Sequence, residues 1–272
     1  MGIVQVEFRL ETWPLSQPFT ISRDTTEELQ VLYCELQRNG CIGRSEAAGV
    51  DYHGETPGSM KRYLEDAIST SKIPWDRLAL LEQMPAGGAR NAIDCALWDL
   101  EAREQRRRVW ELAGVAEPRA LRSTYTICLA EPSKMVADVG FAPPGAVLKL
   151  KLGARDGRDI DRVSAVRRAA PESDLVVDVN EAWSLEELND AARALQRLGV
   201  LLIEQPLRVA HDAALDGYTG SLPPLAMAPA FILAQQCRWV DLDGPLLLSR
   251  DREPAFIFTG SMMQPFGADL WG

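Results

Sequence analysis

The sequence has few histidines and no paired cysteines, and this scarcity argues against several kinds of site. Two histidines, His53 and His211, occur among the 272 residues, and both lie in polar, loop-like stretches. A mechanism that needs a pair of histidines therefore has little to work with. The five cysteines are odd in number and form no C-x-x-C pair, which disfavours a disulfide framework and a zinc–thiolate site. We expect the cysteines to be buried as small apolar side chains.

Long apolar runs and excess positive charge are also lacking. No apolar run approaches the roughly 18 residues needed to cross a bilayer, so we expect no membrane span. The first residues alternate like a strand and show no basic start followed by an apolar block; no secretory signal is expected, and the cytoplasm is the default location. A net charge of −10 repels phosphate backbones, which argues against nucleic acid and favours a small-molecule partner.

Residues 1–118 predict an α+β domain. Apolar and polar residues alternate in the first part, an Asn-Gly pair is a strong hairpin signal, and the later part has helical periodicity. The predicted strands, the turn and the helical stretches are Val4–Arg9, Leu29–Leu36, Asn39-Gly40, Cys41–Ala47, residues 57–82 and Gly87–Glu104. The last helix has an apolar face formed by Ala92, Ile93, Ala96, Leu97 and Leu100.

From residue 119 onward, predicted strands alternate with amphipathic helices, as in βαβ units around a parallel sheet. In chain order these elements are Ser123–Ala130, Pro132–Val139, Ala146–Leu152, Asp159–Ala170, Asp174–Asn180, Ser184–Leu198 and Gly199–Glu204. An open doubly wound sheet also fits this alternation. No G-x-G-x-x-G follows any of these strands, so a dinucleotide-binding fold loses support and a β/α barrel is favoured.

The predicted barrel is too short to be complete. Eight βα units rarely take fewer than about 200 residues, whereas Arg119 to Gly272 comprises 154. Four βα units are recognisable before Pro206, so we expect about three to be missing. A helix is predicted at Ala228–Gln236. We therefore predict an α+β capping domain over residues 1–118, an incomplete β/α barrel over 119–240, and a tail over 241–272 that returns to the capping domain.

Charged residues stand at the ends of three predicted barrel strands, where the chemistry of such barrels is located. Lys149 and Lys151 are two residues apart and therefore point to the same face of their strand. Burying two charged lysines against a packed helix layer would cost free energy, so we expect both side chains to point into the mouth of the barrel. The alternative is that they lie on an edge strand at the protein surface. Close to one another there, each ammonium lowers the pKa of the other and favours a neutral amine base.

Asp178 and Glu204 each follow an apolar run at the end of the next two strands. Two carboxylates that converge at one barrel mouth suit a hard cation such as Mg²⁺, which takes oxygen ligands. Either residue alone is equally well explained as the cap of a loop. Together with the two lysines, they predict a metal-assisted site for proton abstraction.

At this point the sequence resembles a known family. Four segments carry the resemblance to the muconate-lactonizing branch of the enolase superfamily: Lys-Leu-Lys at 149–151, Asp-Val-Asn-Glu-Ala-Trp at 178–183, Ile-Glu-Gln-Pro at 203–206, and residues 89–100. Within that branch the sequence is similar to dipeptide epimerases of the L-Ala-D/L-Glu type. This finer resemblance rests on Val-Asp-Leu-Asp-Gly-Pro-Leu-Leu-Leu at 240–248 and Met-Ala-Pro-Ala-Phe at 227–231.

The resemblance implies roles for five strand-end residues. Asp178 and Glu204 correspond to two of the three carboxylates that bind Mg²⁺ in this family, and Asn180 to a residue that supports the metal ligands. Lys151 corresponds to one catalytic base and Lys149 to its companion. The metal would stabilise the enediolate formed when the α-proton of a carboxylate substrate leaves. Epimerisation also needs a base on each face of the α-carbon.

Three further residues are implied in substrate binding. Asp241 and Asp243 correspond to an Asp-x-Asp pair that holds the ammonium of a dipeptide; without the resemblance, a polar turn before Gly244 explains them. Arg23 corresponds to a mobile-loop position that pairs with a glutamate side chain, although a lone arginine in a loop is usually solvated.

The sequence departs from the family pattern after Ala226. The family continues with a strand that ends in Ala-Asp-Glu-Ser, whose Asp is the third metal ligand, and later with a Lys-x-Asp that supplies the second base. Neither motif occurs here, and no lysine follows Lys151. Leu222–Ala226 resembles the start of the ligand strand but runs directly into residues 227–231. This arrangement predicts an internal deletion whose junction lies at Leu225-Ala226.

Three functions remain open from the sequence. The first is a Mg²⁺-dependent epimerase of a dipeptide such as L-Ala-L-Glu, impaired by the missing ligand and base. The second is a non-catalytic remnant that binds metal or ligand weakly. The third is another superfamily reaction, cycloisomerisation or o-succinylbenzoate synthesis, whose substrates carry no ammonium for Asp241 and Asp243 to pair with. The oligomeric state is open, a homo-oligomer included.

Overall fold

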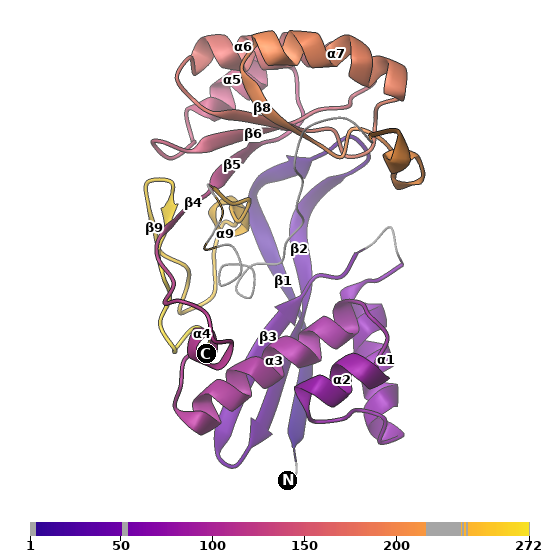
Figure 1. Cartoon of the computed structure of the whole chain (residues 1–272), viewed down its shortest axis with the longest axis vertical. Coiled ribbons are helices and arrows are strands. Elements are labelled where there is room, and N and C mark those ends of the chain that lie inside the picture. The colour runs from indigo at the N-terminus through magenta and orange to yellow at the C-terminus, as the bar shows by residue number, and fades with distance from the viewer. Residues whose placement is uncertain (1–3, 51–53, 216–234, 236, 238, 272) are drawn as a thin grey trace.

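The computed structural model describes residues 4–50, 54–215, 235, 237 and 239–271. Its strands form three separate sheets, and the first and third of them build the two main bodies of the molecule (Figure 1). The predicted capping domain and the predicted β/α units therefore do not share a sheet, which confirms the α+β body followed by a parallel-strand body. The domain boundaries at 118 and 240 stay predictions.

An antiparallel sheet in the order β1-β2-β3 forms the centre of the capping body. The strands are β1 (Gln5–Thr20), β2 (Thr25–Arg38) and β3 (Cys41–Ala47). The β2–β3 turn lies at Asn39-Gly40, where φ is 53° and 78°, as a tight hairpin turn of the predicted kind requires. The β1–β2 pair is far longer than the sequence indicated, because it continues past an irregularity between Pro14 and Phe19.

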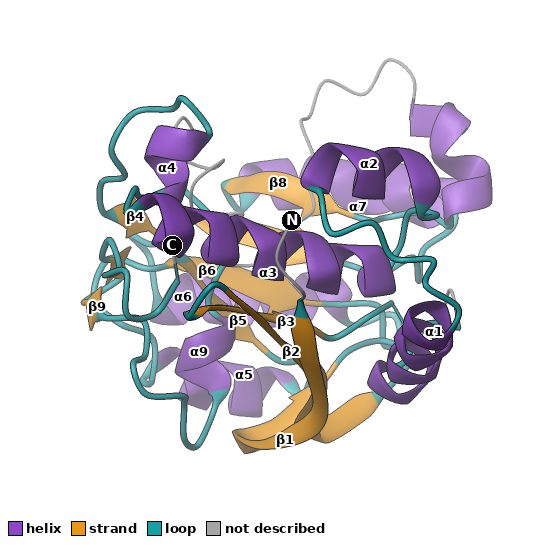
Figure 2. Cartoon of the chain, turned by 90° about the horizontal axis from the view of Figure 1, so that it is seen from below, coloured by secondary structure: helices purple, strands orange, loops and turns teal. Residues whose placement is uncertain are grey.

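Helices cover one side of this sheet, and α3 lies across its strands in Figure 2. They are α1 (Pro57–Ser69), α2 (Arg77–Gln83), α3 (Gly88–Gln105) and the short α4 (Val109–Leu112). The stretch predicted as helical over 57–82 is two helices, because Ser71 has a φ of 54° and Pro74 cannot continue a helix. The predicted apolar face of α3 is confirmed, since all five of its side chains are fully buried.

The second body is a parallel sheet in the order β5-β6-β7-β8, with helices covering one face (Figure 1). Strands and helices alternate as predicted: β5 (Thr124–Ile127), α5 (Pro132–Val139), β6 (Val147–Lys151), α6 (Asp159–Ala169), β7 (Leu175–Asp178), α7 (Leu185–Arg197) and β8 (Val200–Glu204). Apolar residues on alternate strand positions, including Ile127, Leu148, Leu150, Leu175 and Val177, pack with these helices in one core. The intervening positions must therefore point to the opposite face.

The C-terminal region returns to both bodies. Residue Val240 forms a parallel bridge with Ser123 beside β5, and α9 (Gly244–Leu247) follows. A small third sheet joins β4 (Leu121–Arg122), β10 (Met262–Met263) and β9 (Phe258–Thr259). Farther along, Arg252 forms ion pairs with Glu11 and Glu46 of the capping sheet. The tail thus connects the parallel sheet to the capping body.

Several predictions fall on residues outside the described part of the chain. These are the junction at Leu225-Ala226, residues 227–231, most of the helix expected at Ala228–Gln236, and His53. His211 lies exposed in a 3-10 helix over Val209–Leu215. Because residues 216–234 are not described, the expected loss of about three βα units stays a prediction. No helix in the described residues is long and apolar enough to span a membrane.

The cysteines only partly follow the expectation of burial. Cys34, Cys95 and Cys128 are buried and Cys41 is half-buried, but Cys237 is exposed. Burial raises the pKa of the Cys34 and Cys95 thiols to about 12. We expect a thiol reagent at pH 8 to label Cys237 first and to reach Cys34 and Cys95 only after unfolding, because the thiolate is the reactive form. Peptide mapping after timed labelling, with and without urea, measures this order; early labelling of Cys34 would contradict it.

Candidate active site

The charged strand ends predicted from sequence meet on the face of the parallel sheet that the helices do not cover. Lys151 is aligned with Asp178, and Asp178 with Glu204, in the register of β6, β7 and β8. Two residues before Lys151 on β6, Lys149 is aligned with Thr126 of β5. Aligned residues of parallel strands share a face, so these side chains gather near the carboxyl ends of the strands. The expectation that both lysines avoid the helix layer is confirmed.

Lys149 is the centre of this group. Its ammonium Nζ lies 2.7 Å from Glu204 Oε2 and 3.2 Å from Asp178 Oδ2. It also forms an ion pair and hydrogen bond with Asp241 Oδ2. The Lys149 side chain is almost completely buried. The carboxylates of Asp178 and Glu204 therefore approach the same cation-sized position, as the two-carboxylate hypothesis requires. We call Lys149, Lys151, Asp178, Glu204 and Asp241 the ion cluster.

Lys151 completes the ion cluster on its other side. Its ammonium donates a hydrogen bond to Asp178 Oδ2 at 2.6 Å, and both side chains are buried. The ring centroid of Phe19, near the tip of the β1–β2 hairpin, lies 5.6 Å from the Lys151 nitrogen. The capping body thus contributes an aromatic side chain beside the candidate base.

The expectation of a neutral amine at Lys149 is wrong. Burial favours the uncharged amine, but the attraction of Asp241, Asp178 and Glu204 outweighs it and raises the pKa of Lys149 above its ordinary value. Near Lys149, only the charge of Lys151 is visible in the local sequence. The three carboxylates that face the Lys149 ammonium directly come from distant parts of the chain. Lys149 is therefore a charged, immobilised cation in this arrangement.

The two strand-end carboxylates differ in their protonation tendencies. Burial opposes ionisation of Asp178, but Lys151 and Lys149 outweigh it and hold its pKa below the ordinary range. Burial raises the pKa of Glu204, and the attraction of Lys149 offsets this only in part. Asp178 also accepts a hydrogen bond from the Asn180 backbone N–H at 3.0 Å. It is the better fixed and more readily ionised of the two.

Asp241 and Asp243 run alongside β5 and are held by its threonines. Thr124 Oγ1 donates a hydrogen bond to Asp241 Oδ1 at 2.6 Å, and the Thr126 backbone N–H donates to Asp243 Oδ2 at 2.5 Å. Asp243 is buried, and this burial, together with the charge of Asp241, raises its pKa to about 6. Sequence reasoning missed both threonines, although their spacing on the lysine-bearing face of the sheet was a usable signal.

The tip of the β1–β2 hairpin reaches the end of β7. Arg23 Nη1 donates to the Asn180 backbone carbonyl at 3.3 Å, and Ser22 Oγ donates to the same oxygen at 3.4 Å. Leu129 N donates to the Thr20 carbonyl at 3.0 Å, which ties the hairpin to the chain after β5. Arg23 therefore contacts the backbone two residues after Asp178, and its expected pairing with a glutamate side chain of the substrate stays a prediction.

The residues present have the chemistry that a magnesium ion needs. Asp178 and Glu204 offer carboxylate oxygens toward one position, and a cation, the Lys149 ammonium, already lies there. Asn180, itself 8% exposed, has a buried side-chain oxygen without a hydrogen-bond partner. Within the described residues, no three His, Cys, Asp or Glu side chains are spaced to hold a metal as they stand.

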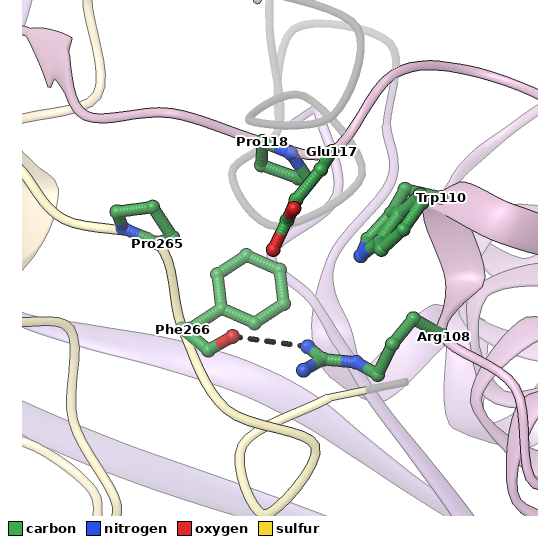
Figure 3. Close-up of a pocket in the computed structure, with 6 residues that line it drawn as sticks. All are labelled: Arg108, Trp110, Glu117, Pro118, Pro265 and Phe266. Atoms are coloured by element: carbon green, nitrogen blue, oxygen red, sulfur yellow. Dashed lines mark hydrogen bonds between the residues drawn. The ribbon is translucent and has the colours of Figure 1, made fainter.

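A separate pocket lies away from these residues. Figure 3 shows Trp110 and Arg108, from α4 and the residue before it, facing Phe266 of the C-terminal segment, with Arg108 donating to the Phe266 carbonyl at 2.9 Å. Its volume is about 50 Å³, and none of the residues that line it belongs to the ion cluster. It is too small for a dipeptide.

Comparison with known proteins shows the family of this chain. The sequence matches the mandelate racemase/muconate lactonizing enzyme N-terminal domain over residues 3–114 and the enolase C-terminal domain-like family over residues 130–226. It is 36% identical to the L-Ala-D/L-Glu epimerase of Escherichia coli, aligned over 78% of this chain and 66% of that protein. It is 32% identical to an N-acetyl-D-glutamate racemase from a Pseudoalteromonas species, over 71% of this chain and 79% of that one.

Solved structures show the same architecture. An enolase family member from Agrobacterium tumefaciens, with homology to dipeptide epimerases and with bound sodium and L-Ala-L-Glu, superposes with a TM-score of 0.87. It is 27% identical, over 99% of this chain and 100% of that chain. An L-Ala-D/L-Glu epimerase structure superposes with a TM-score of 0.81 at 29% identity, over 97% of this chain and 99% of that one. With its antiparallel capping body and parallel β/α body, this chain belongs to the mandelate racemase/muconate lactonizing enzyme family of the enolase superfamily.

Proposed function

We propose that this chain is an isomerase homologue that, with Mg²⁺, removes the α-proton of a dipeptide carboxylate such as L-Ala-L-Glu. One observation carries the proposal: a buried lysine, Lys151, lies hydrogen-bonded to Asp178 at 2.6 Å, beside Glu204, at the carboxyl ends of neighbouring strands. The names of the relatives, epimerases and a racemase, support the reaction class. The relative with bound L-Ala-L-Glu supports the choice of dipeptide.

Asp178 and Glu204 would hold the ion, with Asn180 supporting Asp178 through its backbone N–H. When bound, Mg²⁺ would stabilise negative charge on the substrate carboxylate and so make the α-proton more acidic. Lys151 would take that proton. Because Asp178 contacts both Lys151 and the expected position of the ion, a cation bound there would compete with the Lys151 ammonium for this carboxylate.

Lys151 is the one base assigned here, because no lysine follows it in the sequence. A single base can remove and return a proton on one face of the α-carbon, but inversion requires delivery from the opposite face. We therefore expect exchange of the α-proton with solvent in one epimer and no useful rate of epimerisation. Arg23 is assigned to the substrate side chain, and Asp241 and Asp243 to its ammonium. The cytoplasm remains the expected location.

Proton NMR in D₂O tests this proposal. L-Ala-L-Glu and L-Ala-D-Glu are incubated separately with the chain and MgCl₂, and the Glu α-proton signal is followed. We expect loss of that signal in one epimer, with no appearance of the other. EDTA should abolish the exchange, because the carboxylates alone supply no positive charge to the substrate.

The other outcomes separate the alternatives. Interconversion of the two epimers at ordinary enzyme rates would show that a second residue acts as a base. Absence of exchange with either epimer would leave a non-catalytic remnant. Turnover of a muconate or another substrate without an ammonium, and not of dipeptides, would favour a cycloisomerase function. A muconate cycloisomerase that is 30% identical to this chain is among its relatives.

A further inference from the structure

The long β1–β2 hairpin is interrupted shortly before its tip. The register of the two strands shifts between Pro14 and Phe19, so that residues 15–18 of β1 oppose only Glu27 of β2. Extra residues on one strand bend and twist a hairpin at that point. Pro18, which lies in the interruption, also has no backbone N–H to donate to a neighbouring strand. The pairing with β2 alone therefore does not fix the direction in which the tip leaves the capping sheet.

The C-terminal tail pairs with β1 at this interruption. The contacts are two hydrogen bonds from Ser249, through its backbone N–H and its Oγ, to the Pro14 carbonyl, both at 2.9 Å, a third from Ser16 Oγ to the Leu247 carbonyl at 3.0 Å, and an antiparallel bridge between Leu15 and Leu248. Because β1 is an edge strand of the capping sheet, the tail adds to its outer side. Figure 1 shows α9, which leads into this contact, beside β1. We call residues 247–252 the tail strap.

Arg252 anchors the end of the tail strap to all three strands of the capping sheet. Its guanidinium forms ion pairs with Glu11 of β1 and Glu46 of β3. The guanidinium carbon also lies 5.1 Å from the ring centroid of Trp13 on β1 and 5.0 Å from that of Tyr33 on β2. A planar guanidinium that contacts aromatic rings and pairs with carboxylates at the same time is held in one orientation. The tail strap therefore has a fixed end on the part of the sheet that precedes the interruption.

Beyond the interruption, the tip of the hairpin contacts the parallel body. The Leu129 backbone N–H donates to the Thr20 carbonyl at 3.0 Å. The ring centroid of Phe19 lies 5.6 Å from the Lys151 nitrogen, and Arg23 donates to the backbone after β7. These contacts depend on the direction of the tip, because a small rotation at the interruption moves the tip away from the parallel body.

We propose that Arg252 is a positioning residue: by anchoring the tail strap, it sets the position of the hairpin tip against the parallel body. Its partners described above belong to the capping sheet, so it would act on the site through the hairpin. The effect on substrate rests on the proposed function, in which Arg23 of the tip is assigned to the substrate side chain.

Amide hydrogen exchange of the full chain, followed residue by residue by NMR, tests the inference without any turnover. The Leu129 amide reports whether the tip is docked, because its acceptor is the Thr20 carbonyl. The Leu148 amide, which donates to the Asp174 carbonyl at 2.9 Å within the parallel sheet, is the reference for global stability.

Three variants are compared with the natural sequence. Arg252→Met removes the charge and the ion pairs but keeps an apolar side chain beside the two rings. Arg252→Lys keeps the charge but loses the planar guanidinium, and it provides a milder test if the methionine variant does not fold. Arg193→Met is the matched control, because Arg193 is exposed on α7, in the helix layer of the parallel body.

We expect Arg252→Met to raise the exchange rate of the Leu129 amide by about tenfold or more, the change that losing a charge-assisted contact produces in a local opening equilibrium. The Leu148 amide should stay within about twofold, since Arg252 lies outside the parallel sheet. Arg252→Lys should give an intermediate rate for Leu129. Arg193→Met should change neither amide by more than about twofold.

The substrate gives a second readout through deuterium exchange of L-Ala-L-Glu in D₂O. Arg252→Met should raise the KM by about fivefold or more and change the maximal rate by less than about twofold. Lys151 and Asp178 lie in the parallel body and keep their places, whereas Arg23 moves with the tip; the loss is therefore in binding. Arg252→Lys should recover part of the lost affinity.

The outcomes separate this inference from the proposed function. If Leu129 exchanges at the same rate in Arg252→Met and Arg193→Met, Arg252 does not hold the tip and the inference is overturned. Equal rises for Leu129 and Leu148 would assign Arg252 to global stability and would also overturn it. If the natural sequence exchanges the α-proton of neither epimer, the proposed function fails, and the Leu129 amide still decides whether Arg252 positions the tip.

Discussion

Replacement of Lys151 by methionine should reduce deuterium exchange at the substrate α-carbon by about 10²–10⁴-fold, the usual contribution of a positioned acid–base group. Methionine has a similar length and fits an apolar setting, but it cannot accept a proton. Lys151 is buried next to Asp178 and near the Phe19 ring, so water cannot readily take its place. The initial rate of α-proton loss in D₂O, measured by NMR with saturating dipeptide, gives this ratio.

The matched control for this change is Lys61→Met. Lys61 lies in α1 of the capping body, where it pairs with Glu65 at 3.6 Å, and it has no contact with the ion cluster. Its replacement should leave the exchange rate unchanged. Binding of Mg²⁺ to Lys151→Met, measured by titration, should be retained, which shows that the loss lies in proton transfer. An exchange rate in Lys151→Met equal to that of Lys61→Met would mean that another group takes the proton.

Replacement of Gly43 by alanine should lower the free energy of unfolding by about 3 kcal/mol or more, at the upper end of overpacking effects. Gly43 lies in β3, directly against α3. An added Cβ would lie 2.2 Å from the Ala96 carbonyl oxygen and 2.5 Å from the Leu100 nitrogen. Both atoms belong to the helix backbone and cannot rotate away, so the helix and the strand must separate. Urea denaturation followed by circular dichroism measures the change.

Gly58→Ala is the control for this prediction. Gly58 lies in the first turn of α1, and the nearest heavy atom to an added Cβ is the end of the Arg62 side chain at 3.6 Å. Alanine is the better helix former, so this variant should be unchanged or more stable by up to about 1 kcal/mol. Equal urea midpoints for the two variants would show that β3 and α3 are not packed as described. Because domains typically have only about 5–15 kcal/mol of net stability, the expected loss is readily measured.

The positions of the strand-end residues could be predicted because a parallel sheet collects the carboxyl ends of its strands at one edge. Lys151, Asp178 and Glu204 each close an apolar run, and period-two alternation assigns them to one face. The capping body was also predictable, because the Asn-Gly turn and the apolar face of α3 are patterns of residues close together in sequence. These features depend on residues close together in sequence.

What could not be predicted depends on contacts between distant residues. Lys149 and Asp241 are 92 positions apart, and Thr124 and Asp241 are 117 apart, so no local pattern relates them. For this reason the expected depression of the Lys149 pKa was wrong in sign. The length of the β1–β2 hairpin was also missed, because the proline and irregular pairing between Pro14 and Phe19 interrupt the alternation that identifies a strand.

The pairing of residue 240 with β5 has a consequence for how the chain folds during synthesis. The ribosome releases β5 to β8 before the segment that carries Val240 and Asp241, so β5 has an unpaired edge while the rest of the sheet is already able to form. Bare strand edges pair readily with other chains. A nascent chain stalled before residue 240 should therefore be prone to association with its neighbours. Arrival of the tail pairs with the start of that edge at Ser123 and brings the Asp241 carboxylate to Lys149.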